Sequence, residues 1–469
     1  MQARTKRRAD FTDGPLFAPI FLFVIPIILT GMLQILYNMA DNIVVGRFSG
    51  DELALAAVGS TTSLANLIVN LLMGIAGGAG VVVAQSFGAK RYDILSRAVH
   101  TSVVFSFIAG IAFSIIGLLI ARPALELMGT KPELMDRALL YLKIICIGIP
   151  ATSVYNFGAA VLRSVGDART PLFILSSSGI INVLLNLLFV ICFGMAVDGV
   201  ATATIVAQYL SAIAVILILI FRKNEKYALN IRKLKIDAAI LGRILRLGIP
   251  AGIQGSLFSI SNIIVTKAIN TLPTTDISAK TIAINIEGLV YTAMNSYLHA
   301  AMTFTGQNFG AKKYERIKKV ILFLLIQVTV IGIVGGQIIN LFGKDLAGLY
   351  VAESDPSREI ILESAKRLMS FMLSVYFLCG IMDTLSGVLR GLGYSFAPMI
   401  ISIGAICVLR TLWIYLVFPL EKFNSLVGVY TVYPISWLTG ILFITLTLLY
   451  AMPKIKKSFA EIAEAPKKS

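Results

Sequence analysis

The residues best suited to chemistry lie in the first long apolar stretch. Gln34, Tyr37, Asn38 and Asp41 follow one another at helical spacing, which places all four on one face of a helix. An apolar cavity favours the neutral carboxyl group and a bound cation favours the charged one, so Asp41 can bind a proton or a hard cation reversibly. We therefore predict that Asp41 is the ion-coupling group. The alternative is that Asp41 only caps or packs near the end of its helix.

Neutral polar residues in later apolar stretches can complete this site. Ser178, Asn182 and Asn186 recur every four residues, and Thr204 lies in the next stretch. Amide oxygens coordinate cations without a fixed charge, although such residues also serve as interhelical hydrogen-bonding groups. The predicted ion-coupling set is Asp41, Asn182, Asn186 and Thr204. The predicted substrate cavity is lined by Gln34, Tyr37, Asn38, Asn66, Asn70, Asn156 and Ser178.

The second half of the chain has its own polar set inside apolar stretches. Glu287, Tyr291 and Asn295 recur every four residues, and Asp383 and Arg410 lie further on. Buried acids and bases within one lobe can neutralise each other, and Lys267 is a further candidate partner. The other interpretation is a second proton-responsive site at Glu287 or Asp383.

The elements that must position these residues are membrane-spanning helices. Of the 469 residues, 57% are hydrophobic and only 14% are charged, and the mean hydropathy is +0.84. A soluble domain carries about a quarter charged residues, so this composition predicts an all-α polytopic membrane protein. Twelve apolar stretches are long enough to span: 17–45, 54–84, 99–120, 139–161, 172–194, 199–221, 247–271, 278–304, 320–342, 368–389, 396–418 and 426–451.

The chain contains an internal repeat. The segment from Gln85 to Tyr92 returns from Gln307 to Tyr314, 222 residues later, and Gly166 has a counterpart in Gly393. Six spans per repeat keep both copies in the same orientation, which predicts two parallel six-helix lobes. The predicted parts are an N-lobe (1–221), a basic cytoplasmic linker (222–246), a C-lobe (247–452) and a cytoplasmic tail (453–469).

The basic residues predict the orientation. Both termini and the loops after even-numbered spans hold 28 of the 41 lysines and arginines. Basic residues favour the cytoplasmic side, so we expect both termini in the cytoplasm. The net charge of +16 fits this rule and contact with anionic lipid, and we infer no nucleic-acid site.

The sequence also argues against an enzyme. It has no nucleophile elbow, no H-E-x-x-H motif and no phosphate-binding loop. The four cysteines form no C-x-x-C pair, so we expect no metal site, and no cofactor is indicated. Without an ATP-binding segment, any pumping must draw on an ion gradient.

At residues 15–452 the chain resembles the multidrug and toxic compound extrusion (MATE) family, in its prokaryotic, DinF-like branch. The resemblance rests on Asp41 to Gly46, on both copies of the Gln85 motif, on Val161 to Asp167 with Pro171, and on Gly199 to Thr204. It implies a monomeric, twelve-helix, two-lobe antiporter in the plasma membrane of a prokaryote. Such a protein exports small organic, often cationic, compounds in exchange for protons or sodium.

The resemblance also assigns roles and shows one departure. Asp41 matches the family's usual coupling acid on the first helix, and Asn182 matches an Asn on the fifth. Where a second acid often follows, this chain has Asn186, which favours proton over sodium coupling. The alternative function is a lipid-linked oligosaccharide flippase of the same superfamily, because the buried cations Arg410 and Lys267 suit an anionic ligand.

Overall fold

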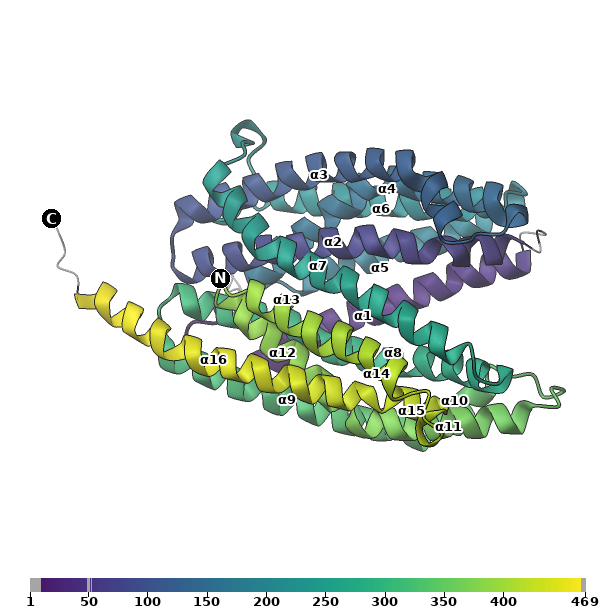
Figure 1. Cartoon of the computed structure of the whole chain (residues 1–469). Coiled ribbons are helices and arrows are strands. Elements are labelled where there is room, and N and C mark those ends of the chain that lie inside the picture. Colours follow the sequence, from purple (N-terminus) through teal and green to yellow (C-terminus); the bar gives the residue numbers. More distant parts are fainter. Residues whose placement is uncertain (1–9, 49–50, 52, 465–469) are drawn as a thin grey trace, which may run out of the picture. The chain divides into compact units, whose positions relative to one another are not determined.

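The computed structural model describes residues 10–464 apart from 49–50 and 52, and every regular element in that part is helical (Figure 1). The elements of the first half are α1 (Phe17–Phe48), α2 (Ala54–Gly88), α3 (Tyr92–Leu127), α4 (Pro132–Ser164), α5 (Arg169–Leu187), η1 (Leu188–Cys192), α6 (Val197–Phe221) and η2 (Ile231–Lys233). Those of the second half are α7 (Ala238–Ile269), α8 (Thr274–Gly310), α9 (Tyr314–Leu341), α10 (Gly343–Gly348), α11 (Arg358–Val375), α12 (Phe377–Gly391), α13 (Phe396–Ser402), η3 (Ile403–Val408), α14 (Leu409–Leu416), η4 (Glu421–Phe423), α15 (Leu426–Tyr430) and α16 (Val432–Glu464).

The described helices include slightly fewer apolar spans than the twelve predicted. Within the described residues, 10 helices are long and apolar enough to cross a membrane, and the pair α11 and α12, bent by 43°, adds an eleventh. The remaining predicted span, the eighth (278–304), lies on α8, which has 37 residues but is more polar than the others. Its buried Glu287 and its amide and hydroxyl side chains explain the difference, because they face protein instead of lipid.

The helices group into two compact units. Unit 1 contains Ile25–Gly255 and unit 2 contains Phe11–Val24 and Ser256–Ser469, of which we describe only the residues given above. The predicted basic linker and the first half of α7 therefore belong to unit 1, whereas the start of α1 belongs to unit 2. Each of these two helices changes unit close to an internal proline, Pro26 in α1 and Pro250 in α7. A proline removes a helical hydrogen bond, so both helices can bend where they change unit.

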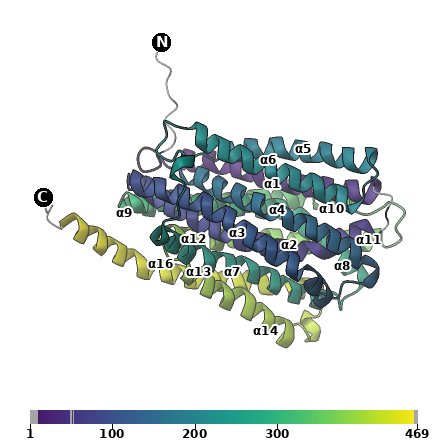
Figure 2. The ribbon, with the colours of Figure 1, turned by 90° about the horizontal axis from the view of Figure 1, so that it is seen from above.

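The internal repeat is visible in the packing of each unit. In unit 1, α4 packs against α2, α3 and α6 (Figure 2). In unit 2, α12 packs in the same way against α8, α9 and α16. The repeated turns are also alike, since Lys90 and Lys312 have φ angles of 56° and 58°, and Gly166 and Gly393 have φ angles of 88° and 95°. The fourth and tenth spans thus occupy equivalent central positions.

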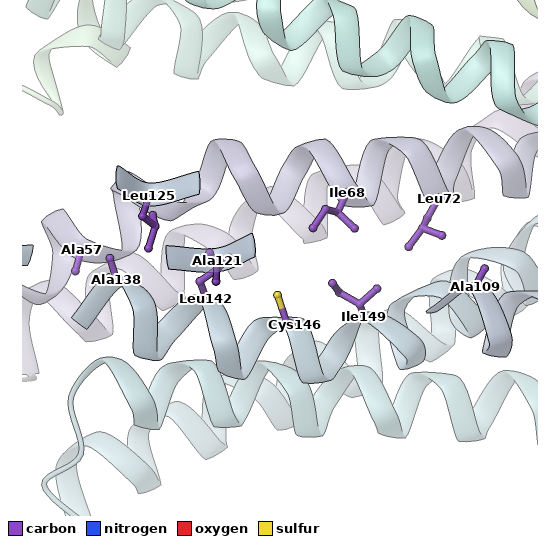
Figure 3. Close-up of a cluster of buried hydrophobic side chains, with 10 residues drawn as sticks. All are labelled: Ala57, Ile68, Leu72, Ala109, Ala121, Leu125, Ala138, Leu142, Cys146 and Ile149. Atoms are coloured by element: carbon purple, nitrogen blue, oxygen red, sulfur yellow. The ribbon is translucent and has the colours of Figure 1, made fainter. Parts of the chain in front are cut away.

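A buried apolar cluster joins α2, α3 and α4 in unit 1. Ile68 and Leu72 of α2 lie opposite Cys146 and Ile149 of α4, and Leu125 of α3 lies at the other end of the cluster (Figure 3). Cys146 is a free, buried thiol within this core, where it packs as a small apolar side chain. The cluster gives α4 a fixed position against its neighbours.

The glycines of α2 allow a close crossing with α7 inside unit 1. A Cβ atom on Gly74 would lie 2.1 Å from the backbone nitrogen of Gly252, and one on Gly78 would lie 2.6 Å from that of Gly248. Small residues let helix backbones approach closely in membranes. The glycine run is therefore a packing surface for the first half of α7.

We expect Gly74→Ala to destabilise the protein by about 1–3 kcal/mol or more, because neither backbone at the crossing can move freely. Gly59→Ala is the matched control in the same helix, since a Cβ at Gly59 meets nothing within 4 Å. Thermal unfolding in detergent measures both variants. Equal unfolding temperatures for the two would contradict the close crossing.

The connections after α2, α4 and α6 meet at one end of unit 1. Arg222, just after α6, forms a 2.7 Å ion pair with Asp167 in the turn before α5. Burial alone would raise the pKa of Asp167, but hydrogen bonds from Thr170 and the charge of Arg222 hold it below its usual range. Arg97 of α3 pairs with Asp237 before α7 at 2.9 Å. These ionic contacts fasten the linker after α6 to the α4–α5 turn and to the start of α3.

In unit 2 the segment before α1 is buried against the repeated motif. The Phe11 backbone N–H donates to Gln307 Oε1 at 3.1 Å, and Asn308 Nδ2 donates to the Phe11 carbonyl at 3.2 Å. The Phe11 ring stacks on Phe304 with centroids 3.9 Å apart. Arg316 Nη1 donates to the Gly14 carbonyl at 2.8 Å. The chain thus enters α1 from a fixed position on unit 2.

Candidate functional site

The end of α1 that carries Asp41 is held by an apolar cluster in unit 1. Val44 and Val45, one turn after Asp41, pack with Val58 of α2 and Val200 of α6. Tyr141 of α4 packs against the same cluster. Asp41 itself is half-buried, so its neighbours supply part of the hydrogen bonding that water would otherwise give.

Three polar side chains from two other helices surround the Asp41 carboxylate. Asn186 Nδ2 of α5 donates to Asp41 Oδ1 at 2.5 Å. Thr204 of α6 lies 3.4 Å from Asp41 Oδ2 through its hydroxyl, and Asn182 Nδ2 donates to that hydroxyl at 3.5 Å. The structure therefore brings together all four residues of the predicted ion-coupling set.

Two groups beside Asp41, the Thr204 hydroxyl and the Asn186 amide, have hydrogen-bonding capacity that is not fully used. The Thr204 hydroxyl also lies 2.9 Å from the Val200 carbonyl, and its single proton serves only one of these acceptors at a time. Asn186 is fully buried, and its Oδ1 has no hydrogen-bond partner among the described residues. An unpaired buried oxygen beside a carboxylate can accept a hydrogen bond or coordinate a cation.

A local change in helix geometry follows Asn186 directly. The chain continues from α5 into the π-helical turn η1, Leu188–Cys192. Single π turns are rare overall, but many of those that occur are at functional sites. The extra residue rotates the residues on either side relative to a regular helix. In unit 2 the π turn η3 similarly precedes Arg410 in the eleventh span.

Tyr37, one turn before Asp41, packs against α5. Its hydroxyl donates to the Ser176 carbonyl at 3.2 Å. A Cβ atom on Gly179 would lie 1.9 Å from the Tyr37 ring, so only glycine leaves room for this contact. Tyr37 therefore joins α1 to α5 two turns before the Asn186 contact.

The structure does not gather the other predicted cavity residues into one site. Ser178 is buried and donates to the Leu175 carbonyl of its own helix at 3.2 Å. Asn70 and Asn156 are half-buried. Gln34, Asn38 and Asn66 are exposed on the surface of unit 1. Their role as substrate contacts remains a prediction.

Unit 2 contains a pocket of about 260 Å³ lined by aromatic and charged side chains. Asp383 and Arg410 line it, and Asn295 Nδ2 lies 3.3 Å from Asp383 Oδ2 and 3.4 Å from the Tyr291 hydroxyl. The aromatic lining consists of Phe258, Tyr291, Tyr376, Tyr433 and Trp437. Aromatic faces with a buried carboxylate suit an organic cation.

The expected neutralisation by direct pairing is not seen in unit 2. Among the described residues, no ion pair joins Glu287 or Asp383 to Arg410 or Lys267. Arg410 instead donates to Ser436 Oγ from Nε and Nη2, both at 3.2 Å, and lies 3.8 Å over the Tyr433 ring. Glu287 is buried with Oε1 unpartnered, and Lys267 is exposed. The contacts observed for the guanidinium are thus a hydroxyl and an aromatic face, not an acid.

Sequence reasoning missed several residues of these sites. Tyr433 and Trp437 hold and line the unit 2 pocket, and their spacing within an apolar stretch was a readable signal. Tyr141 and Gly179 gave no signal, since their importance depends on contacts between distant helices.

Two helical repeats with polar groups buried inside apolar spans define a multi-pass membrane transporter built by duplication. A MatE family profile matches residues 26–188 and 250–416. The chain therefore belongs to the MatE family, whose members are transporters and not enzymes.

Two bacterial relatives are similar to this chain over most of their length. The chain is 30% identical over 438 residues to the probable multidrug resistance protein YoeA of Bacillus subtilis, covering 90% of this chain and 91% of the relative. It is 23% identical over 407 residues to the multidrug export protein MepA of Staphylococcus aureus, covering 85% and 87%.

The fold is also that of a solved transporter. The structure matches one described as the outward-facing conformation of a multidrug resistance MATE family transporter of the MOP superfamily, with a TM-score of 0.88 and 22% identity. The match covers 97% of this chain and 99% of that one. The predicted fold class, an all-helical membrane protein of the MATE type, is confirmed.

Proposed function

We propose that this protein is a secondary antiporter that exports organic cations from a prokaryotic cell. In this proposal one proton enters for each turnover, and two lobes alternate access to a shared path. The observation that carries the proposal is the four-residue site in unit 1, where Asp41 is bonded to Asn186 and approached by Thr204. The names of the multidrug relatives support the substrate class.

Asn186 suits proton exchange because an amide can act in both directions. With Asp41 ionised, Asn186 Nδ2 donates to the carboxylate, as observed. With Asp41 protonated, a rotation of the amide would present Oδ1, which then accepts the carboxyl proton. Asn186 can therefore form a hydrogen bond with Asp41 in both protonation states of the carboxyl group. A second acid at this position would add a negative charge.

Sodium coupling remains the rival mechanism at the same site. The side chains of Asp41, Asn182, Asn186 and Thr204 offer oxygen ligands, and hard cations prefer oxygen. A site with one carboxylate has little negative charge to offset the cost of dehydrating a sodium ion. Proton coupling is therefore favoured over sodium coupling.

The pocket in unit 2 is where we place the substrate within this proposal. Its aromatic faces and Asp383 provide cation–π and ionic contacts for a flat organic cation. Arg410 lines the same pocket and is the observation that keeps a flippase of anionic, lipid-linked oligosaccharides as the second candidate.

The remaining parts of the proposal follow from charge and repeat. The basic loops at one end of unit 1 support a cytoplasmic location for that end, and hence for both termini in a plasma membrane. We propose a monomer, because each chain carries both lobes.

The test is efflux by cells that lack their own multidrug exporters. Cells producing this protein should accumulate less of several unrelated fluorescent organic cations, and a protonophore should restore accumulation. Unchanged accumulation of every cation, together with movement of a lipid-linked oligosaccharide between leaflets in vesicles, would establish the flippase instead.

A further inference from the structure

Between α3 and the linker that follows α6, unit 1 has a second cavity, of about 320 Å³. Its lining is Ser96, Arg97, His100, Lys233, Lys235 and Asp237. The volume is at the lower end of the range for small-ligand sites. Neither the ion site nor the aromatic pocket uses these residues.

The cavity is built on a linker that is fastened to α3. His100 is buried, and its Nε2 accepts the Asn230 backbone N–H at 3.0 Å while Nδ1 lies 2.7 Å from the Ser96 carbonyl. The geometry therefore requires the tautomer with hydrogen on Nδ1. The Asp237 backbone N–H donates to Thr101 Oγ1 at 3.0 Å, which fixes the other end of the cavity wall.

The charge balance of the cavity favours an anion. Arg97 pairs with Asp237 at 2.9 Å and with Asp93, outside the lining, at 3.4 Å. The Ile240 backbone N–H together with Arg97 holds the Asp237 pKa below its usual range. The side chains of Lys233 and Lys235 have no hydrogen-bond or ion-pair partner among the described residues, and both residues are exposed. Two free ammonium groups thus face a partly enclosed space.

The same stretch of linker also exposes large apolar side chains. Ile231 is 62% exposed and Leu234 is 42% exposed, on either side of Lys233. Ser96 to His100 lie at the start of the span predicted for 99–120, so the cavity is at the level where α3 enters the membrane. Exposed apolar groups beside free lysines are the composition of a segment that lies in the headgroup region of an anionic leaflet.

We propose that this cavity binds the phosphate headgroup of an anionic phospholipid, with Lys233 and Lys235 contacting the phosphate. Ile231 and Leu234 contact the acyl chains below it. A soluble phosphate compound would satisfy the lysines but would leave both apolar side chains in water.

The test is native mass spectrometry of delipidated protein with phosphatidylglycerol or phosphatidylcholine of the same chain length. We expect phosphatidylglycerol to bind more tightly. The double variant Lys233→Gln, Lys235→Gln should lose about 25-fold in its affinity, from about 1 kcal/mol for each lysine. The matched control is Lys454→Gln, Lys456→Gln in α16, which removes two exposed lysines at the same spacing and should change little.

Two results would overturn the proposal. One is an equal loss in both double variants, which would indicate general attraction by the net charge. The other is that inorganic phosphate competes with phosphatidylglycerol while Ile231→Ser, Leu234→Ser binds the lipid unchanged, which would make the cavity a soluble-phosphate site. The expected result for that apolar variant is weaker binding of phosphatidylglycerol.

Discussion

We expect Asp41→Asn to reduce gradient-driven export to the background of empty liposomes while the protein still folds. Asn has nearly the same volume, and its amide oxygen can still accept from Asn186 Nδ2, so the packing is kept. It cannot bind a proton or carry a charge, so the coupling step is lost. Even a half-buried carboxylate is costly to desolvate, and its removal should leave the unfolding temperature unchanged or higher.

The matched control is Asp136→Asn, which removes an exposed carboxylate from α4 in the same unit. This variant should export at the wild-type rate. Wild-type export by a well-folded Asp41→Asn protein would remove Asp41 from the coupling role and leave it as a packing residue.

The second large effect is expected at Arg410. Arg410→Ala removes two hydrogen bonds to Ser436 Oγ and the contact over the Tyr433 ring. Hydrogen bonds from a charged group and a desolvated cation–π contact together predict a loss of about 3 kcal/mol in the free energy of unfolding. Thermal unfolding in detergent measures the loss, and Arg122→Ala, at an exposed ion pair on α3, should change it little.

A double variant decides whether Arg410 and Asp383 act as a pair. Since no ion pair joins them in the structure, the effects of Arg410→Ala and Asp383→Ala should add to within about 0.5 kcal/mol. Partial recovery of stability in the double variant would show that the two charges do compensate each other. If Asp383→Asn kept full stability but lost export, unit 2 would contain a second coupling site.

The fold was predictable because membrane spans leave strong local signals. Length, apolarity and the repeated Gln85 motif gave the class of protein, and the structure places the predicted spans on its helices. The exchange of half-helices between units was not predictable, because it depends on tertiary packing around Pro26 and Pro250. From the sequence, 278–304 is predicted to be an ordinary apolar span, but α8 is more polar than that. A helix that faces protein instead of lipid can carry more polar side chains.

The candidate site was predictable in part for a similar reason. Polar groups are expensive inside a membrane, so Asp41, Asn186 and Thr204 were each conspicuous, and the structure places them in contact. The partners of Arg410 were not predictable, since charge alone suggested an acid and the structure supplies Ser436 and Tyr433. The room that Gly179 gives to Tyr37 also appears only when α1 and α5 are packed together.

The most direct test of proton coupling at Asp41 is uptake of a fluorescent organic cation into proteoliposomes under imposed ion gradients. A proton gradient without sodium should drive uptake by the wild-type protein, and the Asp41→Asn protein should show none. A sodium gradient at equal pH on both sides should drive no uptake. Uptake driven by sodium alone, and indifferent to the proton gradient, would contradict this mechanism.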